Sequence, residues 1–139
     1  VIEKNTPLTE YERTGIQVDA IVSSQLLINI FEHNTPLHDG AVIVRGNRVT
    51  SATCYLPLSD NMELSKELGT RHRAGVGISE VTDSMTIIVS EETGKVSIAE
   101  NGRLLRAVTE EELWQHLTVT QDKSVESQKF KLWKGKGKG

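Results

Sequence analysis

Two predicted β-hairpins, separated by a helical stretch, constrain the fold of this chain most strongly. Each consists of two short runs rich in β-branched residues that flank a turn, a pattern typical of antiparallel strand pairs. The runs are 41–44 with 48–55, and 85–89 with 96–99. Because a sheet has to bury at least one face, helices are expected to cover the sheet that these hairpins form.

The remaining segments supply those helices and one more strand. The expected helical segments are 9–13, 25–31, a single turn at 63–68, 72–81, and a segment from Thr109 through Leu117; a strand is expected at 16–22. Two of the helices have N-cap signals, namely Ser23 before the second and the capping box of Thr109 and Glu112 at the last. Together the elements predict an α/β fold with a mixed central β-sheet flanked by helices.

Length and charge define the domain. We expect one compact domain at 1–120 and a disordered basic tail at 121–139, which lacks apolar periodicity. The tail has six Lys and two acidic residues, so a net charge of −3 for the chain leaves −7 on the domain. An acidic domain with 4% aromatic residues is a poor candidate for nucleic-acid binding. The only cysteine, Cys54, lies in a β-branched run and is expected to be buried.

The first candidate loop has the sequence Pro-Leu-His-Asp-Gly-Ala at 36–41 and leads into a predicted strand. The strand would fix the position of Asp39, and Gly40 permits a tight turn and the close approach of a ligand. His38 and Asp39 are adjacent, so both can address one metal ion or one hydroxyl. Asp-Gly is also an ordinary turn sequence, an alternative that this loop alone leaves open.

Two further loops have groups that suit phosphates. In Gly-Thr-Arg-His-Arg-Ala at 69–74, Arg71 and Arg73 lie at an expected helix start, where guanidinium groups and backbone N–H groups both attract phosphate. In Ser-Glu-Glu-Thr-Gly at 90–94, a hydroxyl can meet phosphate and a carboxylate can hold Mg²⁺ or Mn²⁺. A solvated basic stretch and a polar hairpin turn are the simpler interpretations of these two loops.

Taken together, the loops resemble a known family. Asp-Gly-Ala at 39–41, followed about thirty residues later by Arg-His-Arg at 71–73, is similar to the paired signature of diadenylate cyclase domains. The resemblance extends to the flanking strings at 34–38, 55–59 and 89–94, and it covers the chain from about Val1 to about residue 118. It implies the fold of that family.

The resemblance also implies the site residues. The catalytic set is Asp39, Gly40, Ala41, Arg71, His72 and Arg73; the substrate-binding set is Tyr55 and Leu56 at the adenine, with Gly69, Thr70, Ser90 and Glu91; the metal ligands are His38, Asp39 and Glu92. Asp39 is expected to contact both the metal ion and the ribose 3′-hydroxyl. Arg71 and Arg73 are expected to frame the phosphates together with Thr70.

The implied activity is the condensation of two ATP molecules into the second messenger cyclic di-AMP, with release of two pyrophosphates and with Mn²⁺ or Mg²⁺ as cofactor. Each ATP is both nucleophile and electrophile, so two domains that face each other about a two-fold axis would complete the site. The expected partners are ATP and a second copy of the chain. The resemblance adds a membrane-linked regulator and phosphoglucosamine mutase.

The resemblance is closest to the membrane-anchored branch of Gram-positive bacteria. The chain opens at Val1 rather than Met, which suggests a fragment. The resemblance implies that N-terminal transmembrane helices are missing here and that they hold the full-length protein at the cytoplasmic face of the membrane. The fragment itself is expected to be soluble, since no run approaches the roughly 18 apolar residues of a membrane helix.

Two other functions stay open at this point. The first is a non-catalytic nucleotide-binding regulatory domain of the same fold, although a sensor has no need of Asp39 as a hydroxyl-orienting carboxylate. The second is a metal-dependent phosphohydrolase that uses His38 and Asp39. Such enzymes usually gather more ligands than four scattered histidines offer.

Overall fold

The computed structural model describes residues 1–118. A first compact unit extends over Val1–Arg106, and a second unit begins at Ala107. In the second unit a helix covers 110–118, and its capping box forms as predicted: the Thr109 hydroxyl accepts the N–H of Glu112 at 3.1 Å, and the Glu112 carboxylate accepts the N–H of Thr109 at 3.2 Å. The predicted tail, 121–139, lies outside the described residues, and the domain boundary at 120 stays a prediction.

The first sheet contains the first predicted hairpin. Its strand order is β1-β3-β2, with antiparallel pairing throughout. Its strands are β1 (Ile16–Ile21), β2 (Ala41–Arg45) and β3 (Arg48–Cys54), accompanied by the helices α1 (Thr9–Glu12) and α2 (Ser24–Ile30). As predicted, Ser23 is the N-cap of α2, since its hydroxyl accepts the N–H of Leu26 at 3.1 Å.

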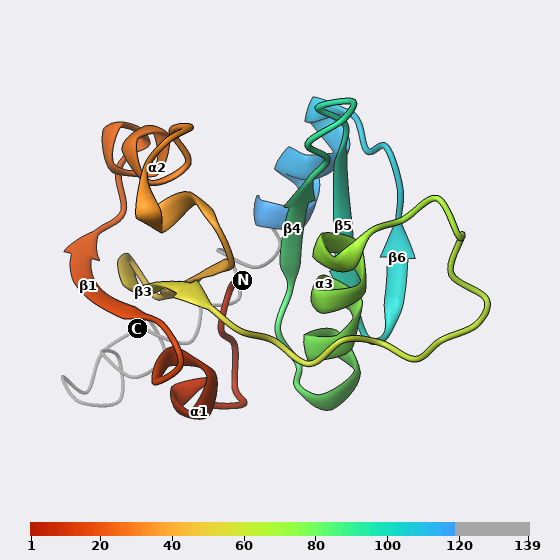
Figure 1. Cartoon of the computed structure of the whole chain (residues 1–139), viewed down its shortest axis with the longest axis horizontal. Coiled ribbons are helices and arrows are strands. Elements are labelled where there is room, and N and C mark those ends of the chain that lie inside the picture. The colour runs from red at the N-terminus through yellow and green to blue at the C-terminus, as the bar shows by residue number, and fades with distance from the viewer. Residues whose placement is uncertain (119–139) are drawn as a thin grey trace, which may run out of the picture. The chain divides into compact units, whose positions relative to one another are not determined.

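The second sheet contains the second predicted hairpin. Its order is β4-β5-β6, again antiparallel. Its strands are β4 (Thr86–Val89), β5 (Val96–Glu100) and β6 (Arg103–Leu105). The helix α3 (Thr70–Val81) packs against β4 and β5 (Figure 1).

Two glycines bring α3 close to its neighbours. A Cβ atom on Gly75 would lie 2.8 Å from the side chain of Ile88, and one on Gly77 would lie 1.9 Å from the carbonyl oxygen of Pro57. The N–H of Ser59 donates to the carbonyl of Arg73 at 2.9 Å, so the loop before the helix is also bonded to its first turn. The position of the arginine-bearing turn is therefore fixed by backbone packing.

The predicted helical turn at 63–68 is wrong. This segment contains turns without a helix. The side-chain oxygens of Asn61 and Ser65 accept the N–H groups of Glu63 and Glu67, at 2.9 and 3.3 Å. Such local bonds compete with helix formation because they occupy the backbone donors.

The N-terminal segment connects the two sheets. Ile2 forms a parallel bridge with Val44 of β2 and an antiparallel bridge with Met85, the residue before β4. The N–H of Ile2 donates to the carbonyl of Met85 at 2.7 Å, and the N–H of Met85 donates back at 3.2 Å. These isolated bridges link the two antiparallel sheets through the N-terminal segment. The combination of sheets and helices confirms the predicted α/β class.

Charged side chains hold the N-terminal segment in this position. The carboxylate of Asp83 accepts the N–H groups of Asn5 and Thr6, each at 2.9 Å, and Lys4 forms an ion pair with Glu100 of β5. Burial alone would raise the pKa of Asp83, but the hydrogen bonds from Thr6 and Asn5 outweigh it and lower that pKa below its usual value. The deprotonated carboxylate is thus the form that the fold favours.

The buried core is distributed between both sheets. One cluster consists of Leu8, Ile43, Cys54 and Ile78. Cys54 is buried, as predicted; burial and then the nearby charge of Glu12 raise the pKa of its thiol to about 11. An inert core thiol follows. Within residues 1–118, no helix combines the length and the apolar character that crossing a bilayer requires.

Candidate functional site

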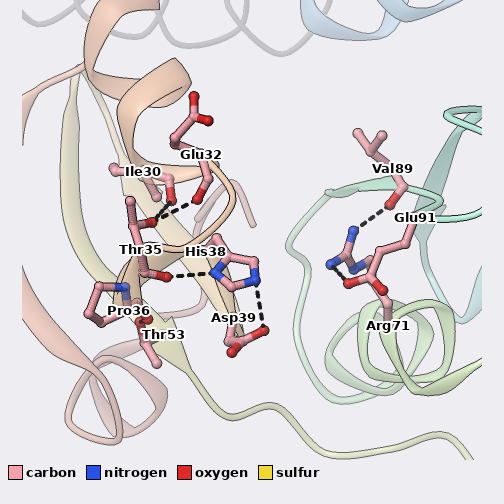
Figure 2. A network of polar contacts seen from close by, with 10 residues as sticks. All are labelled: Ile30, Glu32, Thr35, Pro36, His38, Asp39, Thr53, Arg71, Val89 and Glu91. Atoms are coloured by element: carbon pink, nitrogen blue, oxygen red, sulfur yellow. Dashed lines mark hydrogen bonds and ion pairs between the residues drawn. The ribbon is translucent and has the colours of Figure 1, made fainter.

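The loop before β2 is held from two sides. The hydroxyl of Thr35 donates to the carbonyl of Glu32 at 2.9 Å, which ties the loop to the chain that follows α2. Pro36 starts the 3-10 turn η1 (Pro36–His38), and the hydroxyl of Thr53 donates to the carbonyl of Pro36 at 3.3 Å from the end of β3 (Figure 2). The residues that follow the turn therefore have a defined position.

His38 and Asp39 form a pair at the end of this turn. Nδ1 of His38 lies 2.6 Å from the carbonyl oxygen of Thr35, and Nε2 lies 3.3 Å from Oδ1 of Asp39. Because a carbonyl oxygen only accepts hydrogen bonds, Nδ1 donates, and in the neutral ring Nε2 presents a lone pair to the carboxylate. The pair is suited to a cation or a proton between its two atoms. Asp39 itself is largely exposed.

Gly40 is required by backbone geometry. Its φ of +79° is in the left-handed region, and a Cβ atom would lie 2.9 Å from the Cα and carbonyl carbon of Thr53. The loop therefore runs directly against β3, and Ala41 enters β2 opposite Cys54. The positive φ and this close approach account for the glycine.

The first turn of α3 presents uncapped backbone donors and an unpaired arginine. Gly69 is the N-cap residue and provides no side-chain oxygen to the helix, so the N–H groups of its first turn are left for other acceptors. Thr70 and Arg71 are exposed on this turn, and Arg73 is half-buried. Within residues 1–118 the guanidinium of Arg73 has no acidic partner.

Arg71 joins the second and third candidate loops. Its Nη1 donates to the carbonyl of Val89 at 2.7 Å, and its Nη2 forms an ion pair with the carboxylate of Glu91. Ser90 lies between these two partners, and its hydroxyl accepts the N–H of Thr93 at 3.3 Å. Figure 2 shows Arg71 with its partners Val89 and Glu91 in one view with His38 and Asp39. The first group comes from α3, the end of β4 and the turn after it, and the second comes from the loop before β2.

His72 faces the interior instead of the loops. His72 is only 8% exposed. Burial, and then the charges of Arg106 and Arg71, lower the pKa of His72, so the ring is neutral at physiological pH. The structure thus places His72 as a packing residue of α3, and its predicted catalytic role stays a prediction.

The predicted adenine residues follow β3. Tyr55 is 72% exposed, and its N–H donates to the hydroxyl of Thr14 at 2.8 Å. Leu56 is partly buried and packs against the core cluster that contains Cys54. The aromatic ring is therefore accessible to a ligand, whereas the neighbouring leucine mainly closes the core.

The three predicted metal ligands do not form one group. Glu92 is exposed in the turn after β4, and within residues 1–118 no three His, Cys, Asp or Glu side chains gather as a metal site would require. His38 and Asp39 nevertheless fit a metal ion as a pair. A metal-bound histidine usually donates its other ring N–H to a carbonyl, as His38 does to Thr35.

Three groups at the site were not predicted from the sequence. They are the carbonyl oxygens of Thr35 and Val89 and the backbone of Thr53, whose φ of +58° is unusual for a β-branched residue. Backbone carbonyls leave no sequence signal because every residue has one. The position of Thr53 directly before Cys54 also gives no hint of a left-handed backbone.

The residues of this site lie within the part of the chain that matches a known protein family. The family described as DisA bacterial checkpoint controller nucleotide-binding (DAC) matches residues 1–104. The chain is 58% identical over 137 residues to the cyclic di-AMP synthase CdaA of Bacillus subtilis, covering 99% of this chain and 50% of that protein. It is 58% identical over 140 residues to a diadenylate cyclase of Listeria monocytogenes, with 96% and 50% coverage. The chain thus spans about half the length of these relatives.

Solved structures show the same fold. A crystal structure of a double mutant of DacA from Staphylococcus aureus superimposes with a TM-score of 0.84 at 50% identity, over 86% of this chain and 79% of that one. A structure described as a hypothetical membrane spanning protein from Bacillus cereus gives a TM-score of 0.74 at 44% identity, over 78% of this chain and 53% of that one.

Proposed function

From the finding that this chain belongs to the DAC family of bacterial nucleotide-binding domains, we propose that it is the catalytic part of a diadenylate cyclase. The enzyme condenses two ATP molecules into cyclic di-AMP and releases two pyrophosphates. The relatives named as cyclic di-AMP synthase and diadenylate cyclase support this proposal. Because the chain spans half of each relative, the activity is proposed for the whole protein of which this domain is a part.

The observation that carries the proposal is the unpaired Arg73 on the first turn of α3. A half-buried guanidinium without an acidic partner in residues 1–118 favours an anion nearby. The uncapped N–H groups after Gly69 add positive potential at the same turn. In a domain of strongly negative net charge, these groups are suited to the polyphosphate of a nucleotide.

In the proposed reaction, the ribose 3′-oxygen of one ATP attacks the α-phosphorus of the other. The new P–O bond forms as the bond to pyrophosphate breaks, and the 3′-hydroxyl gives up its proton. Such transfers depend on positioning and charge stabilisation more than on covalent catalysis. A carboxylate is a weak base for an alcohol, so we assign Asp39 first to orienting the hydroxyl and binding metal, and second to accepting the hydroxyl proton.

We further propose Mn²⁺ or Mg²⁺ as the cofactor, held by Nε2 of His38 and the carboxylate of Asp39. Mg²⁺ sites commonly use one or two protein ligands and complete their shell with phosphate oxygens and water, so two residues suffice. A divalent cation supplies charge neutralisation at phosphate and makes a bound hydroxyl more acidic. Glu92 stays a predicted further ligand.

Catalysis is proposed to need two copies of the domain. One domain that holds one ATP supplies half of a reaction in which each ATP is both nucleophile and electrophile. Product formed per subunit should therefore rise with protein concentration in the dilute range. A constant specific activity in a sample that sedimentation shows to be monomeric contradicts this arrangement.

The location and partners of the whole protein are also proposals. The name of the Bacillus cereus neighbour and the half-length match support a protein with additional segments that attach this domain to the cytoplasmic face of the membrane. A membrane-linked regulator and phosphoglucosamine mutase remain predicted partners. Co-purification of the full-length protein from solubilised membranes tests both points.

The direct test of the proposed function is product identity. Purified chain incubated with ATP and Mn²⁺ should yield a compound with the mass of cyclic di-AMP, together with pyrophosphate. ADP or AMP as the product would favour the phosphohydrolase. ATP binding without any product, at concentrations where two copies associate, would favour the regulatory domain.

A further inference from the structure

We propose that Glu91 is a positioning residue, which orients Arg71 toward the phosphates and does not bind the nucleotide itself. This inference rests on the proposed function for the identity of the ligand. It replaces the substrate-binding role that the family resemblance implies for Glu91 with a role that acts through a second side chain.

The guanidinium of Arg71 is held at two of its nitrogen atoms. Nη1 donates to the backbone carbonyl of Val89 at 2.7 Å, and Nη2 pairs with the Glu91 carboxylate (Figure 2). Val89 ends β4, and Glu91 begins the turn that follows. Both acceptors therefore come from one hairpin, in which β4 is paired along its length with β5. A long side chain on the surface obtains one fixed orientation from these bonds.

These bonds leave donors for a nucleotide. A guanidinium has five N–H donors, and the two bonds to Val89 and Glu91 use one on each terminal nitrogen. The remaining donors include the other N–H on each terminal nitrogen and the N–H of Nε. A phosphate can therefore bind Arg71 while the pair with Glu91 stays intact, so displacement of Glu91 is not needed.

The contrast with Arg73 supports this division of roles. Arg73 is half-buried, so packing restricts its side chain, and it has no acidic partner in the described part of the chain. Arg71 is the more exposed of the two and has both a carbonyl and a carboxylate partner. Arg71, the arginine that packing restricts less, is thus the one that has a carboxylate partner to orient it.

The test is a double-mutant cycle in the full chain with 3′-deoxy-ATP and Mg²⁺. This analogue lacks the attacking hydroxyl, so its affinity is measured without turnover. We expect Glu91→Ala to weaken binding roughly three- to fivefold, as for an exposed charge-assisted bond. In the Arg71→Ala background the same substitution should change affinity by less than about 1.5-fold, because the residue it acts through is gone.

Conservative and control variants complete the test. Glu91→Gln keeps an oxygen acceptor and should bind the analogue within about twofold of the wild type. Glu10→Gln, at an exposed position on α1 beside the first sheet, should leave affinity unchanged. An equal loss from Glu91→Ala with and without Arg71 would show direct contact with the nucleotide and overturn the inference. Unchanged or tighter binding by Glu91→Ala, or a loss in Glu91→Gln equal to that in the alanine variant, would also overturn it.

The outcome can be separated from that of the proposed function. If the wild type binds the analogue and the coupling between Glu91 and Arg71 is present, the positioning role stands even when ATP yields no cyclic dinucleotide. If cyclic di-AMP forms but the coupling is absent, the proposed function stands and the positioning role fails.

Discussion

Nε2 of His38 lies 3.3 Å from Oδ1 of Asp39, while Nδ1 of the same ring is bonded to the carbonyl of Thr35. This relationship defines which nitrogen of the ring is available. Since Nδ1 is occupied, a ligand can meet only Nε2, on the side where the Asp39 carboxylate lies. The hydrogen bond to the Thr35 carbonyl thus selects the tautomer of His38 and points Nε2 toward Asp39, the central residue of the proposed reaction.

Asp39→Asn should separate binding from chemistry. The amide keeps the shape of the side chain but loses the charge that orients a hydroxyl and attracts a cation. We expect product formation to fall at least about a hundredfold, while affinity for 3′-deoxy-ATP changes by less than about threefold. Mass spectrometry of the product and equilibrium dialysis measure the two quantities. Asp60→Asn, in an exposed loop, is the matched control, and comparable product from Asp39→Asn and wild type would refute the assigned role.

Replacing both Arg71 and Arg73 with alanine should weaken ATP binding itself. Each guanidinium is expected to contribute a charge-assisted bond of about 1.5 kcal/mol, so the pair amounts to roughly a hundredfold in affinity. Arg48→Ala provides the control, because that arginine is paired with Asp19 on the first sheet. Calorimetric titration is the measurement. Unchanged ATP affinity in the double variant would place the phosphates elsewhere.

Gly40→Ala should destabilise the fold more than Gly46→Ala. Both glycines have positive φ, at +79° and +60°, so both variants have backbone strain of about 1 kcal/mol. Only Gly40 is also packed against Thr53, whereas nothing lies within 4 Å of a Cβ atom on Gly46. We expect Gly40→Ala to lose about 1–3 kcal/mol more unfolding free energy in urea titrations. Equal losses would mean that the loop moves away from β3 without cost.

Asp83→Asn should reduce stability in a pH-dependent manner. The folded state lowers the pKa of Asp83, so its stabilising effect is present above the usual carboxyl range and is lost as pH falls through the lowered value. At pH 7 the variant should unfold more easily by about 1–2 kcal/mol, and the difference should disappear well below pH 3.8. Asp60→Asn is the control. A difference that stays constant with pH would mean that the charge of Asp83 is not involved.

Much of the fold was predictable because its signals are local. Both hairpins are read from β-branched runs and turns, and the caps at Ser23 and Thr109 are read from single side chains. The turn at 63–68 was mispredicted because side-chain oxygens compete for the same N–H groups that a helix needs. Helix periodicity contains no information about that competition.

The site was predictable only as a set of residue types. The order of the loops identifies Asp39 and Arg71, but the ion pair of Arg71 with Glu91 depends on the packing of α3 against β4. The burial of His72 was likewise missed, although it lies between two arginines in the sequence. A helix turns neighbouring residues to different faces, so adjacency along the chain did not mean adjacency at the site.

The bridge formed by Ile2 also governs the order in which the chain can fold. Lys4 and Glu100, which form an ion pair, are 96 positions apart in the sequence. Ile2 needs both Val44 and Met85 as bridge partners. During synthesis, residues 1–6 leave the ribosome long before residues 83–100 exist to receive them. Each hairpin can form early from neighbouring residues, whereas joining the two sheets is a late event that requires the closure of a very long loop.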